Sequence, residues 1–499
     1  MILQAHLLDT DMLSSDVAVI GAGPAGLCIA NALARAGHEV LLIESGGEGI
    51  DLKRDQCFAA EIAGEPMDAE TVRVRTFGGA TALWTGRCGL LDPEDFAPHP
   101  SIANSGWPIA PDALDSFVEQ AAQIIGLNAS PVRRDQRIEQ LSASFAGDAA
   151  LCGYRWSFAP TGRDEHLHFG DAFWNQTAAS STVRCLLECD CVGLEGEGGR
   201  VSAARLVDRT GRSLRLEARQ FVLASGTIES VRLLLLLART TPSLLAQVQP
   251  WLGRGFMQHL RVVAAQVEAT PVQADKLQAS FNRFRRPHSN YEEMGIGTLP
   301  AWRAEAEAGN VVGYFRYHRV RCDPPQRWTE KALRYVLGRE PRLYDPRISL
   351  VVDAEQAPDP RSQITLSNHL DCHGNPRARI DWQIGSLERR TVRLFAQQVA
   401  RWIADAGLGR VMLDPGVIDE RLPPGILLDS LHHLGGARMG RTAADSVVDS
   451  DLRVHGTNNL FVCSGAVFPT GGHINPTTTL IALAFRLAER LARQDEATG

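Results

Sequence analysis

Apolar and polar positions near the start of the chain predict a βαβ unit. The stretches 16–20 and 39–43 are short and mostly apolar, which is typical of parallel strands covered on both faces. Small residues at 25–36 favour a helix between them, and Gly37 fits the end of that helix.

Beyond this unit, the pattern predicts further strands and helices. We expect an amphipathic helix at 111–125, strands at 183–187 and 191–194, and alternating strands at 200–209 and 213–218. A buried strand at 220–224 then leads through small residues into a helix at 228–238. Because strand, turn and helix follow each other again, we expect the chain to re-enter the first sheet here.

The pattern changes in the region 260–425. Alternation predicts strands at 261–268, 311–320 and 347–352, a hairpin of 364–366 and 377–382 around 369–374, and a helix at 387–406. This predicts an antiparallel sheet and therefore a second domain.

The last eighty residues predict one more strand and a long helix. The strand begins at Asn459 and runs into a turn that is rich in glycine. The helix that follows Pro476 carries Leu480, Leu483, Leu487 and Leu491 on one face, and this face predicts a buried element.

The turn of the βαβ unit points to a bound dinucleotide. Gly21 permits a tight turn, Gly23 permits close approach of a pyrophosphate, and Gly26 permits close packing of helix and strand. Glu44 ends the second strand, where it can accept hydrogen bonds from a ribose diol. No Arg or Lys follows Glu44 closely, which disfavours a 2′-phosphate, while NAD and FAD both stay open.

Length and charge limit the class of protein. A chain of 499 residues predicts two or more domains, and a net charge of −7 suggests no nucleic-acid partner. Ten cysteines do not indicate a disulfide scaffold, and the cluster of Cys185, Cys189 and Cys191 lacks metal-site spacing. The first fifteen residues lack a basic segment and the apolar runs are short, so we expect a cytoplasmic, reduced protein without a membrane segment.

Several motifs together resemble the glucose-methanol-choline (GMC) family of FAD-dependent oxidoreductases, and within it the pyranose-oxidase-like branch of sugar and glycoside oxidases. The motifs occur in the family's order at 21–26, 78–79, 107–108, 223–227, 252–259, 432–440 and 475–477. The finer resemblance rests on 78–85 and 472–477.

The resemblance implies a mixed α/β fold (α+β overall) with two domains. A Rossmann-type FAD-binding domain is expected at 12–259 and 426–499, and a substrate domain with a helix-backed antiparallel sheet at 260–425. Parts of 60–180 are expected to cover the active site as well.

The resemblance also implies how FAD is held. Pyranose oxidases attach the flavin to a histidine in the segment that matches 80–84, but Leu83 stands there, so FAD should be non-covalent. Ser464 and Gly465 depart from the acid that many members carry. The expected cofactor-binding residues are Gly21, Gly23, Pro24, Ala25, Gly26, Glu44, Ser45, Gly78, Gly79, Thr81, Leu83, Trp84, Thr85, Cys191, Ser225, Gly226, Gly465, Ala466, Asn475, Pro476 and Thr477.

His432 and Asn475 match the catalytic pair of the family. A histidine suits the role of base because its ordinary pKa is about 6.5. Asn475 is expected to hydrogen-bond the substrate oxygen. His433 and His473 are candidate substrate contacts, and a one-residue slip of the alignment would exchange His432 with His433.

The predicted function is oxidation of a CH–OH group of a sugar or glycoside to a carbonyl or lactone, with oxygen, a quinone or a redox protein as electron acceptor. Two alternatives stay open: the flavin subunit of a membrane-linked dehydrogenase, and a non-redox FAD-containing lyase. No metal is expected, and the oligomeric state is not predicted.

Overall fold

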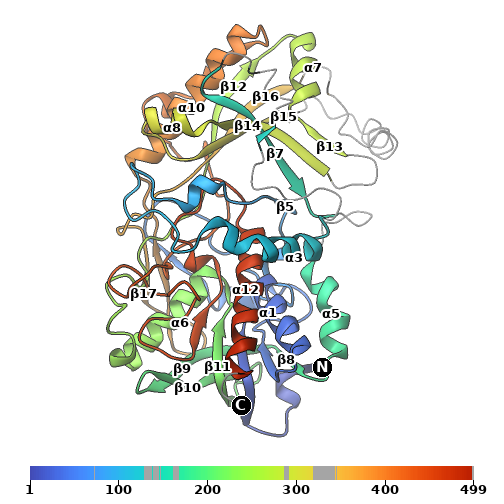
Figure 1. Cartoon of the computed structure of the whole chain (residues 1–499), viewed down its shortest axis with the longest axis vertical. Coiled ribbons are helices and arrows are strands. Elements are labelled where there is room, and N and C mark those ends of the chain that lie inside the picture. Colours follow the sequence, from blue (N-terminus) through green and yellow to red (C-terminus); the bar gives the residue numbers. More distant parts are fainter. Residues whose placement is uncertain are drawn as a thin grey trace.

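The strands of the computed structural model form three sheets. The structure describes residues 1–71, 73–127, 137–138, 145, 148–160, 168–285, 291–318, 343 and 346–496. Within these residues the first sheet has eight strands, the second has ten and the third has three. Figure 1 shows the first sheet at one end of an elongated molecule and the second sheet at the other end.

The first sheet contains the predicted βαβ unit. Its strands, in spatial order, are β1 (Ile2–Gln4), β8 (Val183–Leu187), β3 (Val40–Ile43), β2 (Met12–Ile20), β11 (Ser213–Leu223), β10 (Arg200–Asp208) and β9 (Cys189–Glu197), and β21 (Leu460–Val462) also pairs with β11. Strands β2 and β3 pair in parallel and are joined by α1 (Pro24–Arg35), as predicted.

The predicted return of the chain to this sheet is confirmed, because β11 pairs in parallel with β2. However, the two strands predicted at 213–218 and 220–224 are one continuous strand. The first half of β11 pairs with β10 and its last residues pair with β21. The alternation of apolar and polar residues therefore changes because β11 changes its neighbouring strand from β10 to β21, and not because the strand is interrupted.

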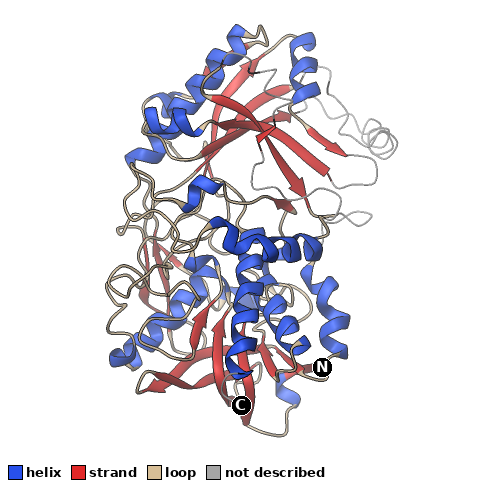
Figure 2. Ribbon diagram, in the orientation of Figure 1, coloured by secondary structure: helices blue, strands red, loops and turns tan. Residues whose placement is uncertain are grey.

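Helices pack around the first sheet (Figure 2). The C-terminal helix α12 (Thr477–Glu496) packs against α1 and α3 (Asp115–Ile125). Its predicted apolar face is buried at Leu483, Leu487 and Leu491. The other helices of this end are α5 (Phe169–Ala179) and α6 (Gly226–Thr240). Among all the described helices, none has the length and apolar character that crossing a bilayer requires.

The second sheet confirms the predicted antiparallel sheet. It runs in the order β19 (Arg410–Leu413), β12 (Leu260–Glu268), β16 (Arg347–Ala354), β15 (Val311–His318), β14 (Tyr291–Thr298), β7 (Leu151–Phe158) and β5 (Arg87–Cys88), with β13 (Arg283–Arg285), β20 (Leu427–Leu428) and β6 (Arg137–Ile138) at its margins. Strands β5, β6 and β7 come from the region 60–180, so this part of the chain does join the second sheet.

Helix α10 (Ser386–Asp405) packs against β12, β15 and β16. The remaining helices of this end are α7 (Pro271–Ser280), α8 (Pro300–Glu305) and α11 (Pro415–Ile418). The predicted strand 311–320 ends at His318, because residues 319–320 lie outside the described part of the chain.

The predicted hairpin belongs to neither large sheet. Its strands β17 (Gln363–Leu370) and β18 (Pro376–Asp381) form the third sheet with β4 (Glu61–Ile62), and they pack on α6. The side chain of Arg232, on α6, donates to the Pro376 carbonyl at 2.7 Å and to Asp371. This buried arginine holds the hairpin beside the first sheet, which the strand pattern alone could not indicate.

A disulfide joins Cys57 to Cys372, although the sequence predicted reduced cysteines. Cys57 follows the short helix α2 (Leu52–Gln56), and Cys372 lies in the turn between β17 and β18. The two residues are 315 positions apart, so their spacing gave no signal of the bond. The bond ties the third sheet to the segment that follows β3.

We expect the double substitution Cys57→Ser and Cys372→Ser to lower the free energy of unfolding by about 2–4 kcal/mol, because the open chain has more conformational entropy when unfolded. Thermal unfolding with and without dithiothreitol measures this effect. The reductant should lower the Tm of the wild type and leave that of the double variant unchanged. An unchanged wild-type Tm, with the two thiols shown to be reduced, would contradict the expectation.

Candidate active site

A cavity of about 840 Å³ is lined by residues from both large sheets. Most of the predicted site residues line it: Gly21, Gly23, Pro24, Ala25, Glu44, Ser45, Thr81, Leu83, Trp84, Thr85, Cys191, Ser225, Gly226, His432, His433, Gly465, Asn475, Pro476 and Thr477. The predicted residues Gly26, Gly78, Gly79, Ala466 and His473 are not among its lining residues. The structure thus brings the predicted cofactor and catalytic residues to one cavity.

One end of the cavity is a glycine-lined cradle at the start of α1. Gly21 has a φ of +106°, and a Cβ there would lie 2.6 Å from the Ala224 carbonyl oxygen. Gly23 is the residue before α1, and no side chain caps the N-terminus of this helix. A Cβ added at Gly23 would meet no protein atom within 4 Å. The exposed helix N-terminus and the space over Gly23 fit the pyrophosphate of a dinucleotide, which needs backbone N–H groups and no side chain in its way.

Three of the predicted glycines shape this cradle from behind. A Cβ on Gly26 would lie 1.9 Å from the Gly21 carbonyl oxygen, so Gly26 allows helix α1 to approach β2. Gly79 packs against Gly23, where an added Cβ would lie 2.9 Å from the Gly23 Cα. The Gly78 N–H donates to the Ala22 carbonyl at 2.9 Å. These residues support the cradle and do not border the cavity.

Glu44 lines the cavity and also fixes the cradle. Its two carboxylate oxygens accept the N–H groups of Ala22 and Gly46, each at 2.8 Å. Burial raises the pKa of Glu44 to about 7, against the lowering effect of these two hydrogen bonds. Glu44 therefore stands where a ribose is expected and holds the turn between β2 and α1 as well.

Asp190 is a neighbour of this end that the sequence did not single out. It accepts the Ser45 hydroxyl, and it lies 2.9 Å from both Arg54 Nη2 and His373 Nε2. Since His373 adjoins Cys372, the disulfide and this cluster together hold the turn of the third sheet against the cavity.

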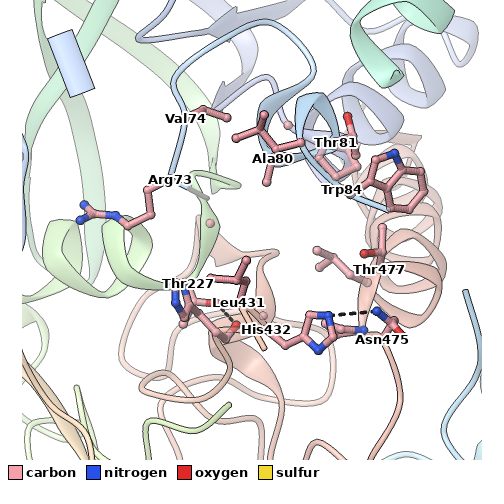
Figure 3. Close-up of a pocket in the computed structure, with 18 of the residues that line it drawn as sticks. Arg73, Val74, Ala80, Thr81, Trp84, Thr227, Leu431, His432, Asn475 and Thr477 are labelled. Atoms are coloured by element: carbon pink, nitrogen blue, oxygen red, sulfur yellow. Dashed lines mark hydrogen bonds between the residues drawn. The ribbon is translucent and has the colours of Figure 1, made fainter. Parts of the chain in front are cut away.

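The other end of the cavity holds His432 and Asn475 (Figure 3). Asn475 Nδ2 lies 3.0 Å from His432 Nε2. On the far side of the ring, His432 Nδ1 lies 2.8 Å from Nδ1 of His259, whose Nε2 is 3.2 Å from the Gly471 carbonyl. His259 ends the motif at 252–259, but nothing in the sequence marked its contact with His432.

The two other predicted histidines differ in position. His433 lines the cavity, and its Nε2 is buried without a hydrogen-bond partner in the described part of the chain. His473 is buried away from the cavity lining and packs edge-to-face on Tyr154, with ring centroids 4.9 Å apart.

Charged side chains line the cavity near His432. Arg261 makes a bidentate pair with Asp353 at 2.6 and 2.9 Å. Arg87 lies 2.7 Å from Glu293 and stacks on the ring of Trp156. Arg87, Arg261 and Glu293 all line the cavity, and the sequence did not single them out, because strands far apart in the chain bring them together.

The histidines of this end are held in the neutral form. Burial lowers the pKa of His432 well below its ordinary value, and the neighbouring His259, Arg261, Arg87 and His433 lower it further. Burial lowers the pKa of His259 to about 4 and that of His433 to about 3. His432 is partly exposed and lines the cavity, so its neutral ring can accept a proton there at neutral pH.

Comparison with known proteins gives two family matches. Residues 16–269 match the family model described as an FAD binding domain, which is just over half of the chain. Residues 358–484 match the model described as GMC oxidoreductase.

Relatives of similar length agree with these matches. The chain is 24% identical to 2-methyl-1,2-propanediol dehydrogenase of Mycolicibacterium austroafricanum, over 98% of this chain and 97% of the relative. It is also 24% identical to paromamine 6′-oxidase of Streptomyces fradiae, over 96% and 91%. The crystal structure of pyridoxine 4-oxidase from Mesorbium loti has the same fold, with a TM-score of 0.61, 19% identity, and coverage of 95% of this chain and 99% of that one.

We expect Gly23→Ala to weaken FAD binding at least about tenfold, a loss of 1.4 kcal/mol or more, while the apoprotein keeps its stability. An added Cβ meets no atom within 4 Å in the protein but occupies space needed by the cofactor. Gly49→Ala is the matched control, because Gly49 also faces open space but does not line the cavity. Fluorescence titration of apoprotein with FAD measures the Kd, and equal values for both variants would contradict the cradle.

Proposed function

Because the chain belongs to the glucose-methanol-choline family of FAD-dependent oxidoreductases, we propose that it oxidises a CH–OH group of a sugar or glycoside to a carbonyl or lactone. The observation that carries the proposal is the placement of His432 and Asn475 in the same cavity as the dinucleotide cradle. A base must lie near the cofactor because the proton and the hydride leave neighbouring atoms of the substrate.

His432 acts as the base in this proposal. Its Nε2 takes the proton when the substrate O–H bond breaks, and its lowered pKa keeps it neutral and ready to do so. When bound, FAD supplies the oxidising power by accepting the hydride from the substrate carbon. Atoms and electrons then balance, since the proton goes to His432 and the hydride carries the electron pair.

Asn475 orients the reacting oxygen. In the structure its side-chain amide donates to His432 Nε2. A substrate hydroxyl that donates to the same nitrogen takes the place of this contact, and the amide then donates to the substrate oxygen. Thr477 begins α12 beside Asn475, so the partial positive charge of this helix end also favours the oxygen as it becomes negative.

We expect FAD to be held without a covalent bond. Leu83 lines the cavity in the segment where related sugar oxidases carry the linking histidine, and this residue is 45% exposed. Leucine offers no nucleophilic atom. The predicted cofactor residues of the cradle and of the segment around Gly465 then act through hydrogen bonds and packing.

The charges near His432 favour a polar substrate without positive charge. Arg283 and Arg316 also line this end; Arg283 stacks on Phe158, and Arg316 donates to the Tyr314 hydroxyl at 3.4 Å. With Arg87 and Arg261 they outnumber the carboxylates Glu293 and Asp353 among the described residues. Stacked rings and paired charges suit a polyhydroxy compound, and the excess of arginine disfavours an amino sugar.

Measurements of flavin reduction and hydrogen peroxide formation also test two alternative functions. The relatives include the large subunit of fructose dehydrogenase from Gluconobacter japonicus, 22% identical over 97% of this chain and 99% of that one, so a role as a dehydrogenase subunit is the second candidate. Good dye reduction with little hydrogen peroxide would favour it, with a quinone or redox protein as acceptor in place of oxygen. A lyase would turn over without bleaching its flavin in the absence of oxygen.

We keep the domain limits as part of the proposal. The FAD-binding domain is assigned to 12–259 and 426–499, and the substrate domain to 260–425. The location in the cytoplasm is proposed from the sequence alone. The Cys57–Cys372 bond argues against it, because disulfides are rare in cytosolic proteins.

We expect His432→Ala to slow flavin reduction by about 10²–10⁴-fold, because the substrate proton loses its acceptor. Bound FAD should be retained, since the cradle is unchanged. Anaerobic stopped-flow measurement of flavin bleaching gives the rate. In the wild type this rate should be constant above a pH of about 6.5 and fall as the pH drops through the lowered pKa of His432.

The control for this variant is His455→Ala, which changes a half-buried histidine outside the cavity lining. It should reduce its flavin at the wild-type rate. Wild-type rates in His432→Ala would rule out His432 as the base.

We expect neutral and acidic sugars to reduce the flavin faster than the matching amino sugars, because like charges repel in the cavity. The rate constant of flavin reduction divided by the substrate Kd should differ by about tenfold or more. An anaerobic titration with glucosides, glucuronides and glucosaminides measures this. Arg316→Gln should raise the KM for the acidic sugars and leave that for the neutral ones unchanged. Preference for amino sugars, or for simple aliphatic alcohols, would contradict the proposed substrate class.

A further inference from the structure

The ring of His259 lies directly against the proposed base. A pair of backbone hydrogen bonds joins Met257 and Leu434, each N–H donating to the other's carbonyl at 2.8 Å. In an antiparallel bridge, residues two positions further along also face each other, so His259 is opposite His432. The ring centroids are 4.9 Å apart, and His259 is 2% exposed.

The hydrogen atoms on the two rings follow from the Gly471 carbonyl. A carbonyl can only accept, so the contact of 3.2 Å requires that His259 carries its hydrogen on Nε2. The Nδ1 of neutral His259 is then a bare acceptor. The contact of 2.8 Å to His432 Nδ1 in turn requires a hydrogen on that atom, which leaves Nε2 of neutral His432 bare.

The contact with Asn475 independently supports these positions of the hydrogen atoms on His432. Its Nδ2 can only donate, and it lies 3.0 Å from His432 Nε2. A hydrogen on His432 Nε2 would place two donors face to face there, and would leave two lone pairs facing each other between the rings. Contacts on both sides of the His432 ring therefore agree on one tautomer.

We propose that His259 is a positioning residue that holds His432 in the tautomer with hydrogen on Nδ1, so that the Nε2 lone pair faces the substrate. This inference rests on the proposed function, in which His432 is the base. It adds that the Gly471 carbonyl, through His259, decides which nitrogen of the base is available.

A neutral ring suits this role better than a carboxylate would. Burial keeps His259 neutral, with a pKa of about 4, so its acceptor adds no negative charge beside the base. A carboxylate in the place of His259 would raise the pKa of His432, so that Nε2 of His432 would already be protonated near neutral pH. When His432 takes the substrate proton, its Nδ1–H still donates to His259, so the proton stays on the base.

The close approach of His259 to the carbonyl depends on a glycine. A Cβ on Gly471 would lie 2.6 Å from Leu434 Cδ1 and 3.4 Å from His259 Nε2. Gly471 therefore leaves room for the ring that its own carbonyl orients. The segment is held in place at Thr470, which accepts from the Trp107 indole at 3.2 Å and donates to the Asp95 carbonyl at 3.2 Å.

Two substitutions in the FAD-loaded enzyme separate the acceptor from the packing. His259→Phe keeps a ring but has no acceptor, so His432 loses its tautomer preference and flavin reduction should slow by about 10–100-fold with little change in substrate Kd. His259→Asn offers an amide oxygen close to the position of Nδ1 and should recover most of the lost rate. His455→Phe is the matched control, and it should behave as wild type.

A direct readout of the tautomer needs no variant of His259. Long-range ¹⁵N–¹H spectra of the histidine-labelled protein identify which ring nitrogen carries hydrogen, and loss of one signal set in His432→Gln assigns His432. We expect a protonated Nδ1 and a bare Nε2 on His432 at neutral pH. Hydrogen on Nε2 instead would overturn the proposal.

The outcomes distinguish this inference from the function on which it rests. A full wild-type rate in His259→Phe, or equal losses in His259→Phe and His259→Asn, would overturn the role of His259 alone. A wild-type rate in His432→Ala would instead overturn the proposed base, whatever the tautomer.

Discussion

The reciprocal backbone hydrogen bonds between Met257 and Leu434 are the constraint on which the site depends. They join the segment that enters the second sheet at β12 to the segment that returns to the first sheet at β21. This bridge sets His259 opposite His432, and β21 then continues beside β11. The loop that follows β21 carries Asn475 to His432, in the cavity that also holds the cradle. Two backbone bonds thus fix the position of the proposed base relative to His259.

The local sequence pattern predicted those helices, strands and turns whose formation is determined by residues close together in the chain. The βαβ unit, α12 and the antiparallel sheet follow from periodicity, and the glycines of the cradle follow from the space that a pyrophosphate needs. The hairpin of the third sheet was wrongly predicted to belong to the antiparallel sheet of 260–425. Its position depends on one arginine, Arg232, whose partners lie far along the chain. His259 was missed for the same reason: its role arises from a bridge between segments that have no shared motif. Contacts of long sequence separation that lie outside a known motif leave no local pattern in the sequence.

The cavity combines a neutral histidine, the proposed base His432, with charged arginines and carboxylates. Arg261 and Arg87 would by themselves make the surroundings of His432 strongly positive, but Asp353 and Glu293 are paired with them. The pairing lets the arginines stay buried and charged while they lower the pKa of the base only in part. An arginine also presents its donors in a plane, which matches neighbouring hydroxyl groups of a ring. In the proposed function, the same arginines therefore influence the pKa of His432 and contact the substrate.

The parts of the cavity come from opposite ends of the chain, and this has a consequence for biosynthesis. The cradle is built from α1 and β3 packed against Ala224, whereas Thr477 and the start of α12, which border the same cavity, come much later in the chain. Domains generally fold as units during synthesis, beginning from the N-terminus. The wall at Thr477 therefore joins the cavity only after the N-terminal unit has been synthesised, so a nucleotide bound before that point would lack this wall.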